Sequence, residues 1–171
     1  MTPRGRDGSG VRLRSMTATD LPAVLMLERE LFPEDAWSEG MLRAELADQP
    51  RTRHYVVAED GGRLVGYAGL AAAGDQGDVQ TIGVRAGHQG RGVGAALLAE
   101  LLDEAGRRGC AAVFLEVRAD NDRARALYER FGFTRVGVRK NYYQPSGMDA
   151  IVMRRRAGAA TVGFTREEDF S

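Results

Sequence analysis

Three alternating glycines, Gly90, Gly92 and Gly94, stand directly before a run of alanines and leucines in the stretch GHQGRGVGAALLAELLDEAGRRG, which begins at residue 87. Alanine and leucine are strong helix formers, so the run predicts a helix over residues 92–106. Glycine lets the chain turn with positive φ, and the first N–H groups of a helix have no intrahelical partner. The pattern therefore predicts a glycine loop between a strand and a helix, with an N-terminus that can bind an anion.

The apolar patterns on either side of this loop predict a mixed α/β sheet. Strands are predicted at 11–14, 54–59, 64–72, 78–84, 112–117, 134–143 and 150–155. Further helices are predicted within 17–32, after Ser38, and at 121–131. Hairpin strands come first and a single strand–helix–strand–helix unit follows, so the sheet should be parallel only near its middle. One domain is predicted over 11–156, between a tail at 1–10 and a tail at 157–171, both rich in small, polar and charged residues.

Charge and composition argue against several classes of partner. Twenty-four basic side chains balance 24 acidic ones, which does not favour an electrostatic nucleic-acid binder. Cys110 is the single cysteine and only two histidines exist, so no metal site is predicted and Cys110 should be a buried structural thiol. The sequence has no run of 18 apolar residues and no apolar segment near its start, so no membrane partner and a cytoplasmic location are predicted.

The glycine loop is compatible with more than one phosphate-binding motif. A P-loop requires Gly-Lys-Ser/Thr at its end, whereas alanines follow Gly94, so that motif is excluded. The run from Gly90 to Ala95 also fits the dinucleotide fingerprint G-x-G-x-x-A, and Glu116 lies at a suitable distance to hold a ribose. Against that fingerprint, residues 85–89 separate the loop from its strand, and the chain has only one strand–helix–strand–helix unit.

Gln89-Gly90-Arg91-Gly92-Val93-Gly94 resembles the acetyl-CoA loop of the GCN5-related N-acetyltransferases, the GNAT superfamily. The run LEVRADNDRARALYERFGF at 115–133 is similar to a later motif of that superfamily. FPEDAWSE and RKNYYQPSGMDAIVM extend the resemblance to the bacterial ribosomal-protein alanine N-acetyltransferases of the RimI type. The resemblance covers 11–156 and implies the GNAT fold, a mixed, mostly antiparallel sheet of about seven strands flanked by about four helices.

The same resemblance implies acetyl-CoA as cosubstrate and assigns residues that bind it. These residues are Ile82, Gly83, Val84, Gly90, Arg91, Gly92, Val93, Gly94, Ala95, Asn121 and Tyr128. From the residues alone, Gly83 could instead mark a bulge, because glycine within a strand often does. Arg91 could be a solvated side chain, and Asn121 could serve simply as a helix N-cap.

The resemblance implies two catalytic residues, a base at Glu116 and an acid at Tyr128, and both are expected on the same side of the sheet. Amide formation from a thioester needs a neutral amine and a protonated leaving thiolate, which a carboxylate and a phenol can supply. Other interpretations stay open on the residues alone. Glu116 could be a solvated carboxylate on a strand face, and Tyr128 lies at helical spacing from Ala124 and Phe131, which is typical of core packing.

The resemblance places Trp37, Tyr142 and Tyr143 around the acceptor, although aromatic residues in such positions are often part of a core. It implies transfer of an acetyl group to the N-terminal alanine of a small-subunit ribosomal protein. QPSGM, in the region of acceptor specificity, departs from the usual family pattern. Two alternatives remain, a broader acetyltransferase for protein N-termini or lysines, and an acyl-CoA-binding sensor or partner subunit without turnover.

Overall fold

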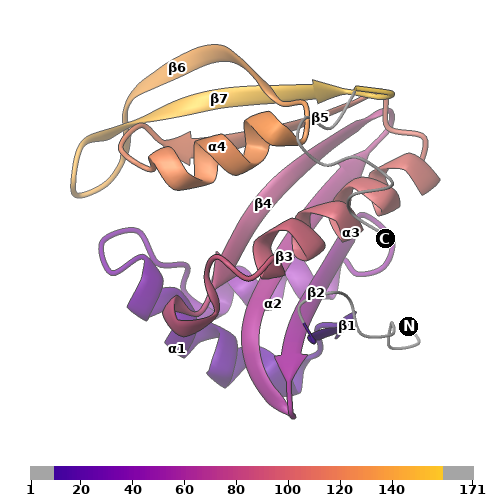
Figure 1. Ribbon diagram of the computed structural model, residues 1–171, viewed down its shortest axis with the longest axis vertical. Coiled ribbons are helices and arrows are strands. Elements are labelled where there is room, and N and C mark those ends of the chain that lie inside the picture. Colours follow the sequence, from indigo (N-terminus) through magenta and orange to yellow (C-terminus); the bar gives the residue numbers. More distant parts are fainter. Residues whose placement is uncertain (1–9, 160–171) are drawn as a thin grey trace.

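Seven strands form one sheet in the order β1-β2-β3-β4-β5-β7-β6 in the computed structural model, which describes residues 10–159 (Figure 1). The strands are β1 (Arg12–Ser15), β2 (Arg53–Asp60), β3 (Arg63–Ala73), β4 (Gln76–Val84), β5 (Ala112–Arg118), β6 (Thr134–Tyr143) and β7 (Met148–Arg156). The helices are α1 (Leu21–Leu31), α2 (Glu39–Ala47), α3 (Val93–Arg107) and α4 (Asp122–Arg130), with short 3-10 turns η1 (Ala18–Asp20) and η2 (Ala86–His88). Only the β4–β5 pair is parallel, as the sequence predicts.

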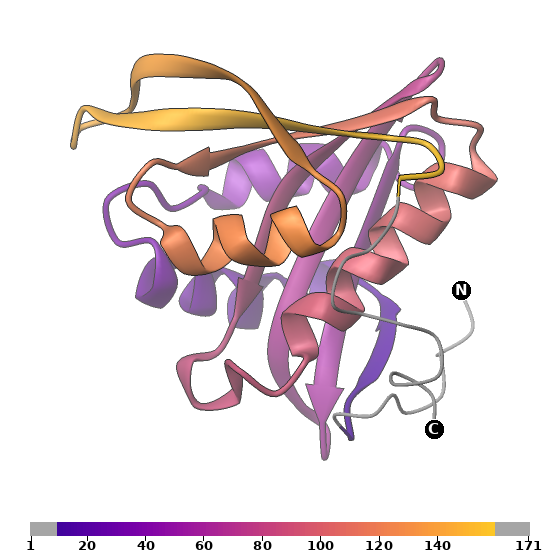
Figure 2. The same ribbon diagram turned by 45° about the horizontal axis from the view of Figure 1, so that its top comes forward.

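Helices cover both faces of this sheet. Figures 1 and 2 show α3 and α4 on one face, with α1 and α2 on the other. The α3–α4 face holds the larger core, to which Leu97 and Leu101 of α3 contribute fully buried side chains. A second core lies under α1 and α2, around Tyr55 and Tyr67. This two-sided burial explains why β3 reads as an almost continuous apolar run.

Polar side chains determine where two of the helices begin. The Ser38 hydroxyl accepts a hydrogen bond of 3.1 Å from the N–H of Met41 and caps α2. Asn121 Oδ1 accepts one of 3.1 Å from the N–H of Ala124 and caps α4. The N-cap predicted for Asn121 is therefore confirmed.

The sheet opens between its two parallel strands. Their pairing ends at Val79 and Leu115, after which β4 and β5 diverge (Figure 1). The pairing of β3 with β4 shifts at the same place, where Gln80 is an extra residue between Val79 and Thr81. A bulge bends and twists a strand, so it accounts for β4 turning away from β5 just beyond Val79. The C-terminal half of β4 is left with one edge free of a neighbouring strand.

The element order and the mixed sheet agree with the sequence-based expectations. Cys110 is buried, as predicted for a structural thiol. No helix between residues 10 and 159 has the length and apolar character needed to cross a membrane. The predicted tails fall largely at 1–9 and 160–171, outside the described residues. The limits of the predicted domain remain a prediction.

Candidate active site

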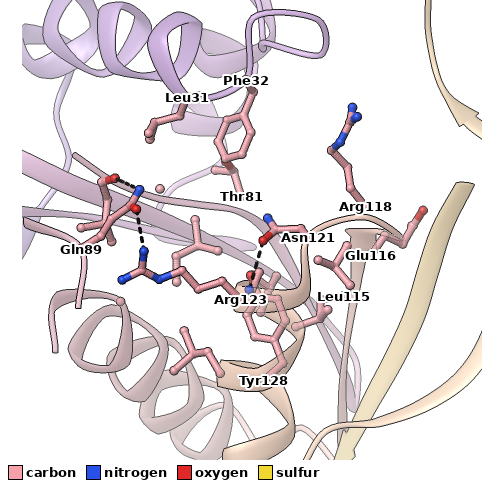
Figure 3. A pocket seen from close by; sticks show the side chains of 18 of the residues that line it. Leu31, Phe32, Thr81, Gln89, Leu115, Glu116, Arg118, Asn121, Arg123 and Tyr128 are labelled. Carbon is pink, nitrogen blue, oxygen red and sulfur yellow. Dashed lines mark hydrogen bonds between the residues drawn. The ribbon is translucent and has the colours of Figure 1, made fainter. Parts of the chain in front are cut away.

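A cleft of about 740 Å³ occupies the opening between β4 and β5. Its walls come from the end of α1 and the segment after it, from β4 beyond Val79, from the glycine loop and the start of α3, and from β5 and α4. Figure 3 shows Leu31 and Phe32 on one wall and Tyr128 on the opposite one. Because the cleft lies where the sheet separates, side chains from both faces reach it.

The glycine loop forms one end of the cleft. Gly90 and Gly92 have φ values of 78° and 84°, a region in which a residue with a Cβ is strained. Gly92 is the N-cap of α3, and no described side chain caps this helix. The first helical bond runs from the N–H of Ala96 to the carbonyl of Gly92 at 2.9 Å. The preceding N–H groups and the positive end of the helix dipole therefore form a main-chain site suited to an anion.

Two side chains connect this loop to its surroundings. Gln89 Nε2 donates a hydrogen bond of 3.1 Å to the carbonyl of Val84 at the end of β4. Arg123 of α4 donates one of 3.0 Å to Gln89 Oε1 (Figure 3). Both Gln89 and Arg123 line the cleft, so Arg123 brings a positive charge beside the anion site.

Not every residue of the predicted cofactor-binding run, residues 90–95, lines the cleft. Gly90, Gly92, Gly94 and Ala95 line it, whereas Arg91 and Val93 do not. Arg91 is exposed, which favours the solvated alternative. Val93 is 1% exposed and packs in the core, so only its main chain can face a ligand.

Ile82, Gly83 and Val84 line the cleft along the free edge of β4. Gly83 pairs regularly with Tyr67, so the alternative of a bulge at this glycine is wrong. A Cβ at Gly83 would lie 2.6 Å from the Tyr67 hydroxyl oxygen. The glycine is thus required by a tyrosine of the neighbouring strand, independently of any ligand.

Tyr128 extends from α4 into the cleft, where its residue is 5% exposed. Its ring meets Phe133 edge to face, with centroids 5.9 Å apart, so the predicted core packing is present. Burial, followed by the nearby Tyr143, raises the pKa of the Tyr128 phenol above its usual value near 10. The phenol therefore keeps its proton through the neutral range and can donate it.

Glu116 lies on β5 between Leu115 and Val117, which are both buried in the core under α3 and α4. Because side chains alternate along a strand, Glu116 extends to the opposite face. Its side chain is 29% exposed and Oε2 lies 3.2 Å from Arg139 Nε. Glu116 and Tyr128 thus belong to different faces of the sheet, so the expectation that they lie on the same side is wrong. Both nevertheless line the cleft, because the cleft passes through the opening. Figure 3 shows them on separate walls.

A second groove, of about 880 Å³, adjoins the cleft on the α1–α2 face. Asp35, Trp37, Glu116 and Tyr143 line both the groove and the cleft. Tyr142 lines only the groove and is 46% exposed, so it is not a core residue. Burial, followed by contact with Glu116, raises the pKa of the Tyr142 phenol. The aromatic residues predicted for the acceptor therefore surround the place where groove and cleft meet.

Arg118 closes one side of this junction. It forms ion pairs with Asp35 and with Asp120, the latter at 3.1 Å. These carboxylates raise the pKa of Arg118, and the largest cause is the hydrogen bond that Arg118 donates to Asp120. Its guanidinium carbon also lies 5.6 Å from the centre of the Tyr143 ring. Arg118 therefore joins β5, the segment before α2 and the end of β6.

Sequence reasoning did not select several residues that line the cleft, namely Glu28, Asp35, Gln89, Arg118 and Arg123. Glu28 had a detectable signal. It lies four residues after Val24 and three after Leu25, on the apolar face of α1, where a charged residue is unusual. Asp35 and Arg123 had none, because their positions depend on how segments distant in sequence pack.

Comparison with known proteins places these features in a family. Residues 21–133 match the model of the acetyltransferase (GNAT) family. The chain is 46% identical over 157 residues to the N-alpha-acetyltransferase RimI of Mycobacterium tuberculosis, covering 89% of this chain and 96% of that protein. It is 35% identical over 145 residues to the [ribosomal protein bS18]-alanine N-acetyltransferase of Escherichia coli, covering 82% of this chain and 94% of the relative.

Solved structures agree with these relatives. The crystal structure of the ribosomal-protein-S18-alanine N-acetyltransferase from Escherichia coli superposes with a TM-score of 0.73 at 32% identity, covering 90% of this chain and 96% of that one. The ribosomal-protein-alanine N-acetyltransferase from Brucella melitensis gives a TM-score of 0.73 at 26% identity, with 84% and 98% of the two chains covered. The fold expected from the sequence is confirmed, and the chain belongs to the GNAT family of acetyltransferases.

Proposed function

We propose that this protein transfers the acetyl group of acetyl-CoA to the N-terminal alanine of ribosomal protein bS18. Support comes from relatives named for this reaction that are 35% identical to the chain and from a RimI relative that is 46% identical. Each alignment extends over more than four fifths of both chains. We propose that the reaction takes place in the cytoplasm, where a ribosomal protein acceptor would be met.

The cleft fits a donor of this kind. Its glycine loop offers N–H groups and a helix N-terminus to a diphosphate, and Arg123 adds a positive charge beside them. The free edge of β4 at Ile82–Val84 offers main-chain groups to an amide-containing arm, as an added strand would use them. Acetyl-CoA supplies an activated acyl group as a thioester. Asn121 caps α4 at the cleft, and we propose that it also contacts the donor.

We assign proton removal from the amine nitrogen to Glu116 and proton donation to the leaving sulfur to Tyr128. The ammonium form of the acceptor first loses one proton. The neutral amine nitrogen then attacks the thioester carbonyl, the carbon–sulfur bond breaks, the nitrogen gives up a second proton and the thiolate takes up one. An N-terminal amine has a pKa of about 7.7–8.0, so removing its proton at pH 7 costs about 1 kcal/mol. A lysine amine, with a pKa near 10.4, would cost about 5 kcal/mol. A carboxylate such as Glu116, acting directly or through water, is therefore a sufficient base for an N-terminal amine.

Proton donation to the leaving thiolate suits Tyr128. Its phenol is buried in the cleft and has a raised pKa, so it is protonated at the start of the reaction. The acceptor would enter from the groove on the other face, between Trp37, Tyr142 and Tyr143. This arrangement assigns the amine and its base to one side of the opening and the thiolate and its acid to the other.

The observation that carries the proposal is a cleft lined by both an uncapped helix N-terminus and this carboxylate–phenol pair. A panel of peptides with acetyl-CoA tests it, with thiol release and mass spectrometry as readouts. Release with an alanine-starting peptide and addition at its N-terminus support the proposal. Release with lysine peptides whose N-termini are blocked would indicate a broader acetyltransferase. Tight coenzyme A binding without release from any peptide would indicate an acyl-CoA-binding protein.

A further inference from the structure

Glu28 is a buried carboxylate between the cleft and the chain that links α1 to α2. Its residue is 2% exposed. Oε2 accepts a hydrogen bond of 3.0 Å from the N–H of Trp37. Oε1 accepts hydrogen bonds from the hydroxyl of Tyr67 and from that of Thr81, the latter at 3.4 Å. Burying a carboxylate is costly unless donors surround it, so this set of partners needs an explanation.

The partners of Glu28 lie in different kinds of structure, two in paired strands and one in an irregular segment. Tyr67 and Thr81 belong to paired strands, where Tyr67 faces Gly83 and Thr81 faces Gly69. Trp37 instead belongs to residues 32–38, here called the linking segment, which is neither helix nor strand. The hydrogen bond between Glu28 and Trp37 therefore connects the irregular linking segment to the sheet. Tyr67 and Thr81 of the sheet orient the Glu28 side chain that makes this connection.

The linking segment forms part of the site. Phe32, Asp35 and Trp37 line the cleft, and Asp35 and Trp37 also line the adjoining groove. A second tie, the Arg118–Asp35 ion pair, holds the middle of the segment, while Glu28 holds its end next to α2. Loss of the Glu28 tie would release the Trp37 main chain at the place where cleft and groove meet.

We propose that Glu28 is a positioning residue for the acceptor: it holds the linking segment in the conformation that forms the acceptor wall. The inference rests on the proposed function, because it assumes that the groove receives the acceptor peptide. It makes acceptor affinity depend on Glu28. Donor binding depends on the glycine loop and the edge of β4, which strand pairing and α3 hold in place.

A positioning role is distinguishable from a proton-transfer role by the amide variant. In Glu28→Gln, the amide oxygen can accept from the Trp37 N–H, and the amide nitrogen can donate to the Tyr67 hydroxyl, which both donates and accepts. Glu28→Gln therefore keeps both bonds but cannot take up a proton. Glu28→Ala removes both bonds and the longer one from the Thr81 hydroxyl. Positioning predicts that the glutamine variant is active and the alanine variant is impaired.

The test compares these variants by kinetics and by the fluorescence of Trp37, the single tryptophan of the chain. In Glu28→Ala the KM for an alanine-starting peptide should rise about tenfold, while kcat and the KM for acetyl-CoA stay within about twofold. The emission of Trp37 should shift to longer wavelength and its quenching by acrylamide should increase. In Glu28→Gln all of these should stay close to the parent values.

Glu100 provides a matched control. It is 3% exposed on α3, contacts His54 Nε2 at 2.8 Å and Arg107 at 3.3 Å, and lines neither the cleft nor the groove. Glu100→Ala also removes a buried carboxylate, so it should lower thermal stability yet leave the peptide KM and the Trp37 emission unchanged. If Glu28→Ala does not fold, Tyr67→Phe removes one donor to Glu28 and keeps the ring. It should then show the same changes at smaller amplitude.

Parent-like peptide KM and Trp37 emission in Glu28→Ala would overturn the inference. A large loss of kcat in Glu28→Gln would also overturn it, because that loss indicates proton transfer by Glu28. If the parent protein releases no thiol with any peptide, the proposed function fails. The fluorescence comparison then still decides whether Glu28 holds the linking segment.

Discussion

Glu116 and Tyr128 line one cleft from opposite faces of the sheet. Such a placement is possible only because β4 and β5 stop pairing at Val79 and Leu115, which leaves an opening through the sheet. A group held in that opening can meet a carboxylate from one face and a phenol from the other.

Glu116→Gln should lower kcat with the alanine-starting peptide by about a hundredfold or more, because the amide cannot accept a proton. Coenzyme A affinity, measured by calorimetry, should stay near that of the parent protein, because Glu116 belongs to β5 and not to the glycine loop or the edge of β4. Glu39→Gln is the control, since Glu39 is an exposed glutamate of α2 paired with Arg43. Near-parental turnover in Glu116→Gln would remove this residue from the mechanism.

Tyr128→Phe should also lower kcat by about a hundredfold or more, with the donor still bound. The ring packs against Phe133 and would be kept, so the loss should not come with a large drop in thermal stability. Tyr55→Phe is the matched control. Tyr55 is fully buried and its hydroxyl donates a hydrogen bond of 2.8 Å to Glu45, outside the cleft. Tyr55→Phe should lower thermal stability without lowering kcat. A loss of kcat in Tyr55→Phe together with parent-like kcat in Tyr128→Phe would contradict the assignment of Tyr128 as the acid.

The pH dependence should reflect the acceptor amine before it reflects Tyr128. The neutral amine is the reactive form, so kcat/KM should rise with pH until about 8, near the usual amine pKa. Burial raises the pKa of Tyr128, so its protonated form persists to higher pH than that of an exposed tyrosine. No decline is therefore expected below about pH 10. A decline between pH 8 and 10 that disappears in Tyr128→Phe would show that the phenol ionises earlier than its burial implies.

Gly92→Ala should weaken acetyl-CoA binding, because Gly92 has a φ of 84° at the N-cap of α3. The substitution forces strain of roughly 1–2 kcal/mol or a shift of the N–H groups that follow, and either outcome disturbs the anion site. Gly61→Ala in the β2–β3 turn, where φ is 60°, is the control for strain alone. The KM for acetyl-CoA should rise in the first variant and stay constant in the second. Equal KM values would mean that the loop does not hold the donor.

Local sequence patterns predicted much of this fold. The glycines before an Ala- and Leu-rich run predicted the loop and α3, and Asn121 and Ser38 predicted two caps. Glu116 was recognisable as a charged residue within an apolar strand, but Phe114 interrupts the alternation, so the face that Glu116 occupies was not predicted. The opening itself was not predictable, because the bulge at Gln80 is defined by the register between β3 and β4. Glu28 shows the same limit, since its partners come from three other parts of the chain.

The position of coenzyme A in a crystal structure of its complex with this protein decides whether the cleft is the donor site. The diphosphate should lie within hydrogen-bond distance of N–H groups at the start of α3. The pantetheine arm should lie along Ile82–Val84, with the sulfur in the opening between Glu116 and Tyr128. Coenzyme A bound elsewhere, or with its sulfur outside that opening, would contradict this assignment.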